Sequence, residues 1–328
     1  MLKKLLAVDD EPNNLQVLRQ ILRERYQLIF APNGEKAIEA AALHQPDLIL
    51  LDIMMPDMNG YQVCARLKEN PATRDIPVIF VTAMSEVEDE ARGFDVGAVD
   101  YIQKPVSASI LLRRVETHLS LVQMQKLEKS YEQAVFMLGA AGHYNDTDTG
   151  VHIWRMAAYA CALARKAGWQ ECDVRLLALA APMHDTGKIG TPDEILKAPR
   201  KLSGEEWTIM QRHAEIGHGI LSKSDYKVFV MAAEIAHFHH EKWDGNGYPK
   251  GLAGIDIPES ARIVAIADVF DALTMKRPYK EAWSIADSMA EIRRGAGQHF
   301  EPRLVELFEA LLPELVRIKA EWDQSQRS

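Results

Sequence analysis

The sequence of 328 residues contains little cysteine. Its three cysteines, Cys64, Cys161 and Cys172, lie far apart, and no CxxC pair occurs. A disulfide framework needs paired cysteines, and a sulfur-bound metal site needs several close together. The sequence therefore excludes a disulfide-stapled fold and a cysteine-ligated metal site, and it suits a reducing compartment.

Long hydrophobic runs and excess positive charge are also missing. No stretch of about 18 apolar residues occurs, and the N-terminal MLKKLLAVDDEPNN reaches acidic residues too early for a signal peptide. The formal net charge of −9 argues against a broad electrostatic grip on DNA. We therefore expect a cytoplasmic protein that neither inserts into membranes nor binds DNA.

Length and composition indicate two folded domains. A chain of 328 residues is long for one core, and 47% hydrophobic with 26% charged residues is ordinary globular material. In the first 122 residues, short apolar runs alternate with helix-like stretches, which predicts an α/β fold with a doubly wound, five-stranded parallel sheet. The expected strands are 5–8, 26–30, 47–51, 77–81 and 99–102.

Acids, a hydroxyl and a lysine stand at the carboxyl ends of these runs, where doubly wound sheets bind ligands. Asp9 and Asp10 follow the first run, and Asp52 follows the third. Thr82 comes after the fourth run, and Lys104 after the fifth. Close carboxylates repel one another unless a divalent cation with oxygen ligands relieves the repulsion. The pattern predicts a cation site with a lysine beside it that can hold a phosphoryl group.

With its LLDIMMPDMNG, VTA and KP motifs in order, the stretch from residue 3 to about 120 closely resembles the receiver domain of bacterial response regulators. The resemblance implies a flavodoxin-like sheet, a sensor histidine kinase as partner, and Asp52 as the phosphoacceptor. It also implies Mg²⁺ bound by carboxylates, and a switch that contacts the phosphoryl group. The implied Mg²⁺ ligands are Asp9, Asp10 and Asp52, and the implied switch residues are Thr82, Tyr101 and Lys104.

A stretch without glycine or proline, residues 107–138, has apolar residues at helical spacing. We expect one long helix that continues out of the receiver. It either pairs with a second copy as a short coiled coil in a homodimer, or packs on its own output domain. The sequence does not separate these alternatives. The expected domains are a receiver at 1–122, this overlapping linker, and an output domain at 139–328.

Histidine is concentrated in the output domain. Nine of the 11 histidines fall between residues 143 and 299, among segments of helical pattern that predict an all-α domain. Two are adjacent, in HHEKWDGNGYP at 239–249. Imidazole and carboxylate donors suit first-row transition metals such as Fe, Mn, Ni, Zn or Co.

The histidines and aspartates of the output domain are too many to bind a single metal ion. If Asp185 bridges two ions, the donors divide into two groups. Two ions about 3.5–4 Å apart can activate water and clamp a phosphodiester. Isolated histidines are more often structural, so His143, His218, His237 and His299 receive no role. The first group is His152, His184 and Asp268, and the second is His213, His239 and His240.

Two motifs are specific, HDxGK at 184–188 and HHExxDGxGYP at 239–249. Through them, residues from about 140 to 315 resemble the HD-GYP subclass of HD-domain phosphohydrolases, which cleave the second messenger cyclic di-GMP to pGpG. The resemblance implies the seven ligands above and catalytic roles for Asp185 and Lys188, with Lys188 on the scissile phosphate. It also implies that Arg277 and Lys280 hold the substrate phosphates. The rival hypothesis is a non-catalytic receptor for the same messenger.

The GYP motif itself comprises Gly247, Tyr248 and Pro249. We expect φ > 0 at Gly245 and Gly247, with Pro249 stiffening the exit of the turn. The loop is either a docking surface for a partner such as a diguanylate cyclase, or a turn packed by Tyr248. One departure from the family pattern is Asp148 in place of glutamate. Because aspartate is one methylene shorter, a third ion at Asp148 and a second cleavage to GMP stay open.

Overall fold

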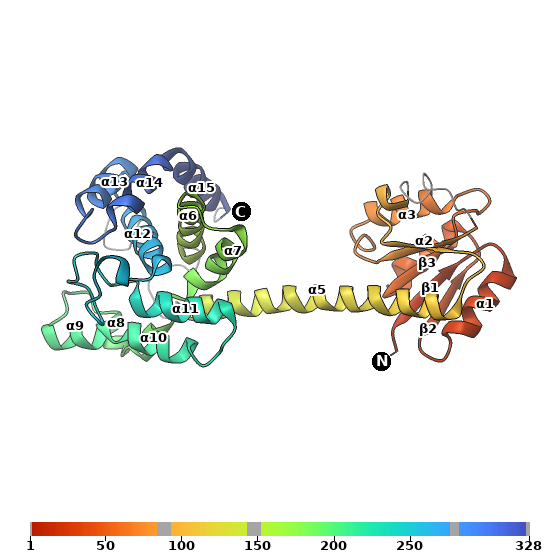
Figure 1. Ribbon diagram of the computed structural model, residues 1–328, viewed down its shortest axis with the longest axis horizontal. Helices are drawn as coiled ribbons and strands as arrows, with labels where there is room; N and C mark the ends of the chain where they lie inside the picture. The colour runs from red at the N-terminus through yellow and green to blue at the C-terminus, as the bar shows by residue number, and fades with distance from the viewer. Residues whose placement is uncertain (1, 84–92, 143–151, 276–281, 326–328) are drawn as a thin grey trace. The chain divides into compact units, whose positions relative to one another are not determined.

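The computed structural model shows two compact units, Met1–Lys129 and Ser130–Ser328, joined within one helix (Figure 1). The division falls inside the linker that the sequence predicts. Among the described helices, none is long and apolar enough to cross a membrane. The structure describes residues 2–83, 93–142, 152–275 and 282–325.

The N-terminal unit is built on a five-stranded parallel sheet in the order β2-β1-β3-β4-β5. This confirms the predicted α/β fold, and each expected run contributes one strand. Because helices cover both faces of such a sheet, its inner strands β1, β3 and β4 are largely apolar and buried. The strands are β1 (Lys4–Val8), β2 (Gln27–Ala31), β3 (Leu48–Leu51), β4 (Val78–Thr82) and β5 (Asp100–Gln103).

Alternation along the strands builds one core on each face of the sheet. Leu5 and Ala7 of β1 lie in the core that α1 (Pro12–Leu22) and α5 (Ala108–Gly142) cover. Leu6 and Val8 lie in the opposite core. Residues of α2 (Gly34–His44) and α3 (Gly60–Glu69) pack in that core with them.

Helix α5 has 35 residues and belongs to both units. Its first turns bury Leu111 and Val115 in the receiver core, and Val135 is buried in the core of the C-terminal unit. Between them, Leu121, Met124 and Leu127 are 49–70% exposed. The middle of the helix therefore presents apolar side chains to solvent.

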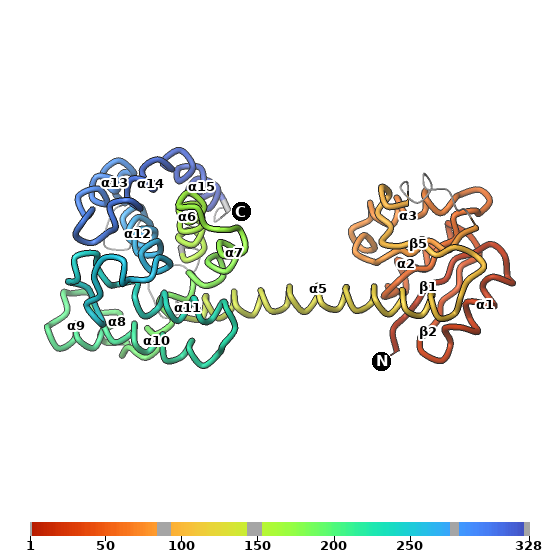
Figure 2. Tube along the Cα trace, viewed as in Figure 1, coloured from red at the N-terminus to blue at the C-terminus, as the bar shows by residue number. Residues whose placement is uncertain are grey.

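The described part of the C-terminal unit is helical, which confirms the all-α prediction. Its central helix, α6 (His152–Lys166), packs against α7, α12, α14 and α15 (Figure 2). The other helices are α7 (Glu171–Ala180), α8 (Asp193–Leu196), α9 (Gly204–Gln211), α10 (His213–Leu221), α11 (Lys227–Phe238), α12 (Glu259–Thr274), α13 (Ile285–Arg294), α14 (Pro302–Ala310) and α15 (Leu312–Ser325), with short 3-10 turns η1 (Ala181–Met183), η2 (Thr186–Gly190) and η3 (Gly254–Asp256).

A buried ion pair joins α6 to α12. The Arg155 guanidinium donates to both carboxylate oxygens of Asp271, at 2.6 and 3.1 Å. The two side chains are only 4% and 1% exposed. Arg155 lies three residues after His152, and Asp271 three residues after Asp268, so the pair fixes the register of two helices that carry expected metal ligands.

The helical path of the chain is interrupted at two places beside expected ligands. The segment containing Pro182 changes from α7 to the 3-10 turns η1 and η2, because proline lacks the N–H that would continue the helix. The stretch from Gly204 to Leu221 breaks at Arg212 into α9 and α10. In this way His184 follows η1 and His213 begins α10, and both side chains are buried.

Candidate phosphoacceptor site and metal centre

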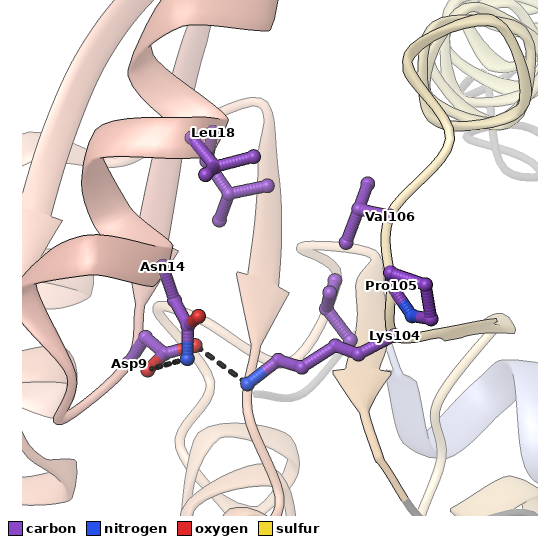
Figure 3. A pocket seen from close by; sticks show the side chains of 8 residues that line it. Asp9, Asn14, Leu18, Lys104, Pro105 and Val106 are labelled. Atoms are coloured by element: carbon purple, nitrogen blue, oxygen red, sulfur yellow. Dashed lines mark hydrogen bonds and ion pairs between the residues drawn. The ribbon is translucent and has the colours of Figure 1, made fainter.

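The loops after β1, β3 and β5 bring an acidic cluster together at one edge of the receiver sheet. The Lys104 ammonium lies 2.8 Å from carboxylate oxygens of both Asp9 and Asp52. Oxygens of Asp9, Asp10 and Asp52 lie within 4.8 Å of one another. Figure 3 shows the Lys104 side chain extended toward Asp9, which also accepts a hydrogen bond from Asn14.

Burial and the lysine oppose each other at this edge. Burial raises the pKa of the Asp52 carboxyl, and the hydrogen bond and charge of Lys104 only partly offset it. Burial alone would lower the pKa of Lys104, but its hydrogen bonds to Asp52 and Asp9 raise it. The lysine therefore supplies the positive charge that holds two close carboxylates together.

The other expected receiver residues lie next to this edge. Thr82 is the last residue of β4 and is buried, and Tyr101 in β5 is 8% exposed within the core beneath α2 and α3. Gly60 is a contributor that the sequence reasoning passed over. A Cβ there would come within 2.3 Å of the Asp52 carbonyl oxygen, so only glycine lets α3 begin this close to the acid.

In the C-terminal unit, donors from four segments surround Asp185. His213 and His239 face its Oδ1, with their Nε2 atoms at 3.3 and 3.7 Å. His184 Nε2 lies 3.2 Å from Oδ2. Two donors that share one ion at bonds of about 2.1 Å lie about 3.0–3.5 Å apart. The two oxygens of one carboxylate therefore face two separate groups of donors.

His240 and Asp268 complete these two groups among the described residues. A ligand atom of His240 lies within 4.8 Å of those of Asp185, His213 and His239. Asp268 Oδ1 lies 3.8 Å from His184 Nε2. Lys188 is at the Oδ2 side as well, with its ammonium 2.8 Å from that oxygen. Each donor group thus holds residues that the sequence analysis placed together.

Backbone carbonyls orient three of the imidazoles. The Nδ1 atoms of His184, His213 and His239 lie 2.9, 2.7 and 3.0 Å from the carbonyl oxygens of Ala181, Met210 and Ile235. A carbonyl accepts only from N–H, so the proton of each neutral ring is on Nδ1. The Nε2 atoms then point toward Asp185 as potential ligands.

Electrostatics at the cluster favour cation binding. Burial lowers the pKa of His213 to about 4 and holds that of His240 well below its usual range, so both rings stay neutral. Burial alone would lower the pKa of His184, but Asp185 and Asp268 raise it to about 9. Although burial would raise the pKa of Asp185, Lys188 and His184 hold it well below the usual range. A metal ion can replace the proton on His184.

The donor set fits a divalent transition metal. Asp185 Oδ1, His213 Nε2 and His239 Nε2 are buried and have no hydrogen-bond partner among the residues that the structure describes, although burying a polar atom without a partner is costly. Neutral imidazoles with a carboxylate match first-row transition metals, and the donors do not distinguish Fe, Mn, Ni, Zn and Co. These atoms would be satisfied as ligands.

Several expected site residues lie outside this geometry. Asp148, Arg277 and Lys280 fall outside the described residues, and of His152 only its place as the first residue of α6 is described. Three histidines without an expected role contact other rings. The His218 and His237 ring centroids are 4.3 Å apart, and His299 stacks on Phe300 with centroids 4.2 Å apart.

Gly187 and Glu241 support the centre, and the sequence reasoning gave neither a role. A Cβ on Gly187 would lie 1.9 Å from the His213 carbonyl oxygen, so glycine is what lets η2 approach α10. The buried Glu241 carboxylate accepts hydrogen bonds from three successive backbone N–H groups, at Lys250, Gly251 and Leu252. Gly187 lies in the HDxGK motif and Glu241 in the HHExxDGxGYP motif, and this membership is the sequence signal that could have identified them.

The GYP loop packs directly against the histidine cluster. The Tyr248 ring stacks on His240, with centroids 4.7 Å apart and planes 28° apart. Gly245 has a φ of +81°, as expected, but Gly247 does not adopt positive φ. The expected positive φ at Gly247 is therefore wrong. Glycine is needed there because a side chain would not fit. A Cβ would lie 2.3 Å from the Lys242 nitrogen and 2.4 Å from the Glu241 Cα.

Comparison with known proteins places both units in one family. Residues 5–116 match the model of the response regulator receiver domain, and residues 117–304 match that of an HD domain. A probable cyclic di-GMP phosphodiesterase of Vibrio cholerae is 41% identical, covering 93% of this chain and 76% of that protein. The cyclic di-GMP phosphodiesterase response regulator RpfG of Xanthomonas campestris is 35% identical, covering 92% and 86%.

A cyclic di-GMP phosphodiesterase of Thermotoga maritima is 36% identical and covers 96% of this chain and 92% of that protein. These relatives match the chain across both units, over most of their own length. The matches agree with a parallel sheet that carries an acidic edge, followed by a helical unit with a histidine and aspartate cluster. The chain therefore belongs to the family of response regulator phosphodiesterases in which a receiver domain is joined to an HD domain.

Proposed function

We propose that this protein hydrolyses cyclic di-GMP to pGpG at the histidine and aspartate cluster, under the control of phosphorylation at Asp52. One observation carries the proposal. The two oxygens of Asp185 face two separate groups of donors, as a ligand shared by two ions requires. The substrate is proposed from the names of relatives that match nearly the whole chain.

Each donor group would hold one ion. His184 and Asp268, with His152 from the start of α6, would bind the first, and His213, His239 and His240 the second, with Asp185 common to both. Bound there, two divalent ions supply an activated water and positive charge beside the scissile phosphodiester. A third ion at Asp148, and with it cleavage on to GMP, stays a prediction.

Lys188 would act on the substrate directly. Its ammonium lies at the Oδ2 side of Asp185, 2.8 Å from the carboxylate, and its side chain is 20% exposed. A cation held beside Asp185 can contact the phosphoryl oxygens of the substrate and stabilise the charge that develops on them. We propose Arg277 and Lys280 as further contacts to the substrate phosphates.

The control signal would enter through α5. A sensor histidine kinase would phosphorylate Asp52, with Mg²⁺ held by Asp9, Asp10 and Asp52, and with Thr82, Tyr101 and Lys104 responding to the phosphoryl group. The last turns of α5 pack on the ligand-bearing segment. A Cβ at Gly139 would meet Pro182 at 3.2 Å, and one at Gly142 would meet Thr186 at 3.0 Å. A shift of α5 would therefore press on the residues that flank His184 and Asp185.

Two partner proposals concern surfaces. The exposed Leu121, Met124 and Leu127 of α5 favour pairing with a second copy, which would make the protein a homodimer. The GYP loop would serve as the docking surface for a diguanylate cyclase. In the described structure Tyr248 faces His240, so such a partner would meet the polar residues of the turn rather than the tyrosine ring.

Hydrolysis by separately loaded protein tests the proposed function. The full chain would be loaded with Mn²⁺, Fe²⁺, Ni²⁺ or Zn²⁺ and given cyclic di-GMP, with and without beryllofluoride at Asp52, beside Asp185→Ala. We expect pGpG from at least one metal form, a changed rate with beryllofluoride, and no product from the variant. Binding of cyclic di-GMP without turnover in every metal form would instead establish a receptor.

A further inference from the structure

The four clustered histidines are not held in the same way. His184, His213 and His239 each have Nδ1 on a backbone carbonyl, which fixes the ring. His240 has no such bond to any residue that the structure describes. Its ring stacks on Tyr248 instead, at 4.7 Å. The orientation of this one ring therefore depends on another side chain.

Neighbouring rings close in on His240. Its centroid is 3.9 Å from that of His239 and 5.0 Å from that of His213, which lies perpendicular to it. Tyr248 adds a further ring, near-parallel to the imidazole at 28°. The tyrosine ring also meets the edge of Trp207 at 6.3 Å. If the tyrosine ring were removed, a space would open into which the imidazole could turn, away from Asp185.

The loop that carries Tyr248 is itself fixed. The Tyr248 N–H donates to the His240 carbonyl at 3.2 Å. The buried Glu241 carboxylate binds the three N–H groups that follow Pro249. Gly247 lies against the Glu241 backbone with no room for a Cβ. The HHE and GYP ends of the motif therefore form one closed unit, which explains why the two occur together.

We propose that Tyr248 is a positioning residue for the second ion, and that its ring holds His240 in the orientation that points to Asp185. The inference rests on the proposed metal site. The tyrosine acts through the face of its ring, since the stack does not involve the hydroxyl. Its ring contacts are with His240, His213 and Trp207, and it has no ring contact with His184 among the residues that the structure describes. Its loss should therefore weaken the second ion and spare the first.

Metal binding by full-length variants tests this. Tyr248→Phe keeps the ring and Tyr248→Leu removes it, while the backbone bond to His240 remains in both. Tyr226→Leu, at the exposed N-cap position of α11, is the matched control. Mn²⁺ would be titrated into metal-free protein, and the bound ions counted by calorimetry and by paramagnetic resonance of coupled and isolated Mn²⁺.

We expect the wild type to bind two ions, and Tyr248→Phe and Tyr226→Leu to bind both with the affinities of the wild type. In Tyr248→Leu one affinity should fall about 10–100-fold, with the signal of isolated Mn²⁺ growing as the coupled signal is lost. Unchanged binding of both ions by Tyr248→Leu, or equal weakening of both, would overturn the proposal.

A double-mutant comparison removes the ambiguity of a damaged fold. In a His240→Ala background, Tyr248→Leu should cause no further loss of metal affinity, because the ring it positions is gone. An additive further loss would show that the tyrosine acts elsewhere. Hydrolysis of cyclic di-GMP is measured separately. A wild type that binds two ions but makes no pGpG contradicts the proposed function and leaves the positioning role standing.

Discussion

The receiver edge and the histidine cluster both collect aspartates, yet they stabilise them by means that only partly overlap. At the receiver edge, close carboxylates are neutralised by Lys104, a cation of the chain itself. In the HD unit the Lys188 ammonium also lies 2.8 Å from Asp185, but imidazoles surround this aspartate as well, and three of them are bound to backbone carbonyls. The first arrangement relies on charge alone, and the second adds fixed geometry to charge.

This difference suits the two kinds of ion expected. Oxygen donors on loops bind Mg²⁺ loosely and leave room for its waters and a phosphoryl group. Oriented imidazoles hold a transition metal firmly, because little ordering is needed when the ion arrives. Aspartate can thus serve both kinds of site. One kind forms and dissociates with a signal, and the other stays intact through catalysis.

The largest expected effect is the loss of Asp185. Since its two oxygens face both donor groups, Asp185→Asn should remove both ions and lower phosphodiesterase activity by at least about 10³-fold. Metal analysis of purified protein and product chromatography measure the two effects. The control is Asp52→Asn, the same change at the receiver edge, which should retain the metals. Retention of both ions by Asp185→Asn would break the comparison.

Breaking the ion pair between α6 and α12 should cost stability in one unit only. Arg155→Met leaves the Asp271 carboxylate buried without its guanidinium, a change that typically costs about 3–5 kcal/mol. All six tryptophans lie in the C-terminal unit, so their fluorescence during urea unfolding of the full chain reports that unit alone.

The control is Arg165→Met, also on α6, which breaks an exposed pair with Glu171 of α7 and should leave the unfolding midpoint almost unchanged. An Arg155→Met transition that coincides with that of the wild type would show that the buried pair contributes nothing.

Gly187→Ala tests the claim that geometry governs the HD site. The added Cβ would collide with the His213 carbonyl, so η2 and α10 must separate. We expect metal affinity to fall about 10–100-fold. Gly219→Ala on α10, where a Cβ meets nothing within 4 Å, should bind metal like the wild type. Equal titration curves for the two variants would contradict the expectation.

The smallest effect concerns charge at the receiver edge. In Mg²⁺-free protein Asp52 should titrate above an ordinary aspartate, because burial raises its pKa. Lys104 opposes that rise, so Lys104→Met should move the pKa of Asp52 still higher, and the carboxyl should take up its proton as the pH falls from a higher value. Carbon NMR of the labelled carboxyl measures this. A downward shift in Lys104→Met would mean that the lysine does not stabilise the carboxylate.

The sequence predicted more of the receiver than of the HD unit. The five strands and their acidic edge followed from local patterns, because apolar runs and parallel topology bring strand ends to one side. The predicted grouping of the seven HD ligands rested on the type and number of donors and on motifs rather than on spacing. Glu241 and Gly187 received no role, since a carboxylate that binds a distant turn and a glycine that admits a distant carbonyl leave no periodic signal.

By itself the sequence determined the kinds of donor present, the α/β and all-α character of the two regions, and the long helix between them. These depend on composition and on interactions within a few residues of each other. Only the tertiary structure decided which oxygen of Asp185 faces which histidine, which rings bind carbonyls, and that Tyr248 packs on His240. Such choices depend on close packing between segments far apart in the chain, where a shift of one ångström changes which atoms meet.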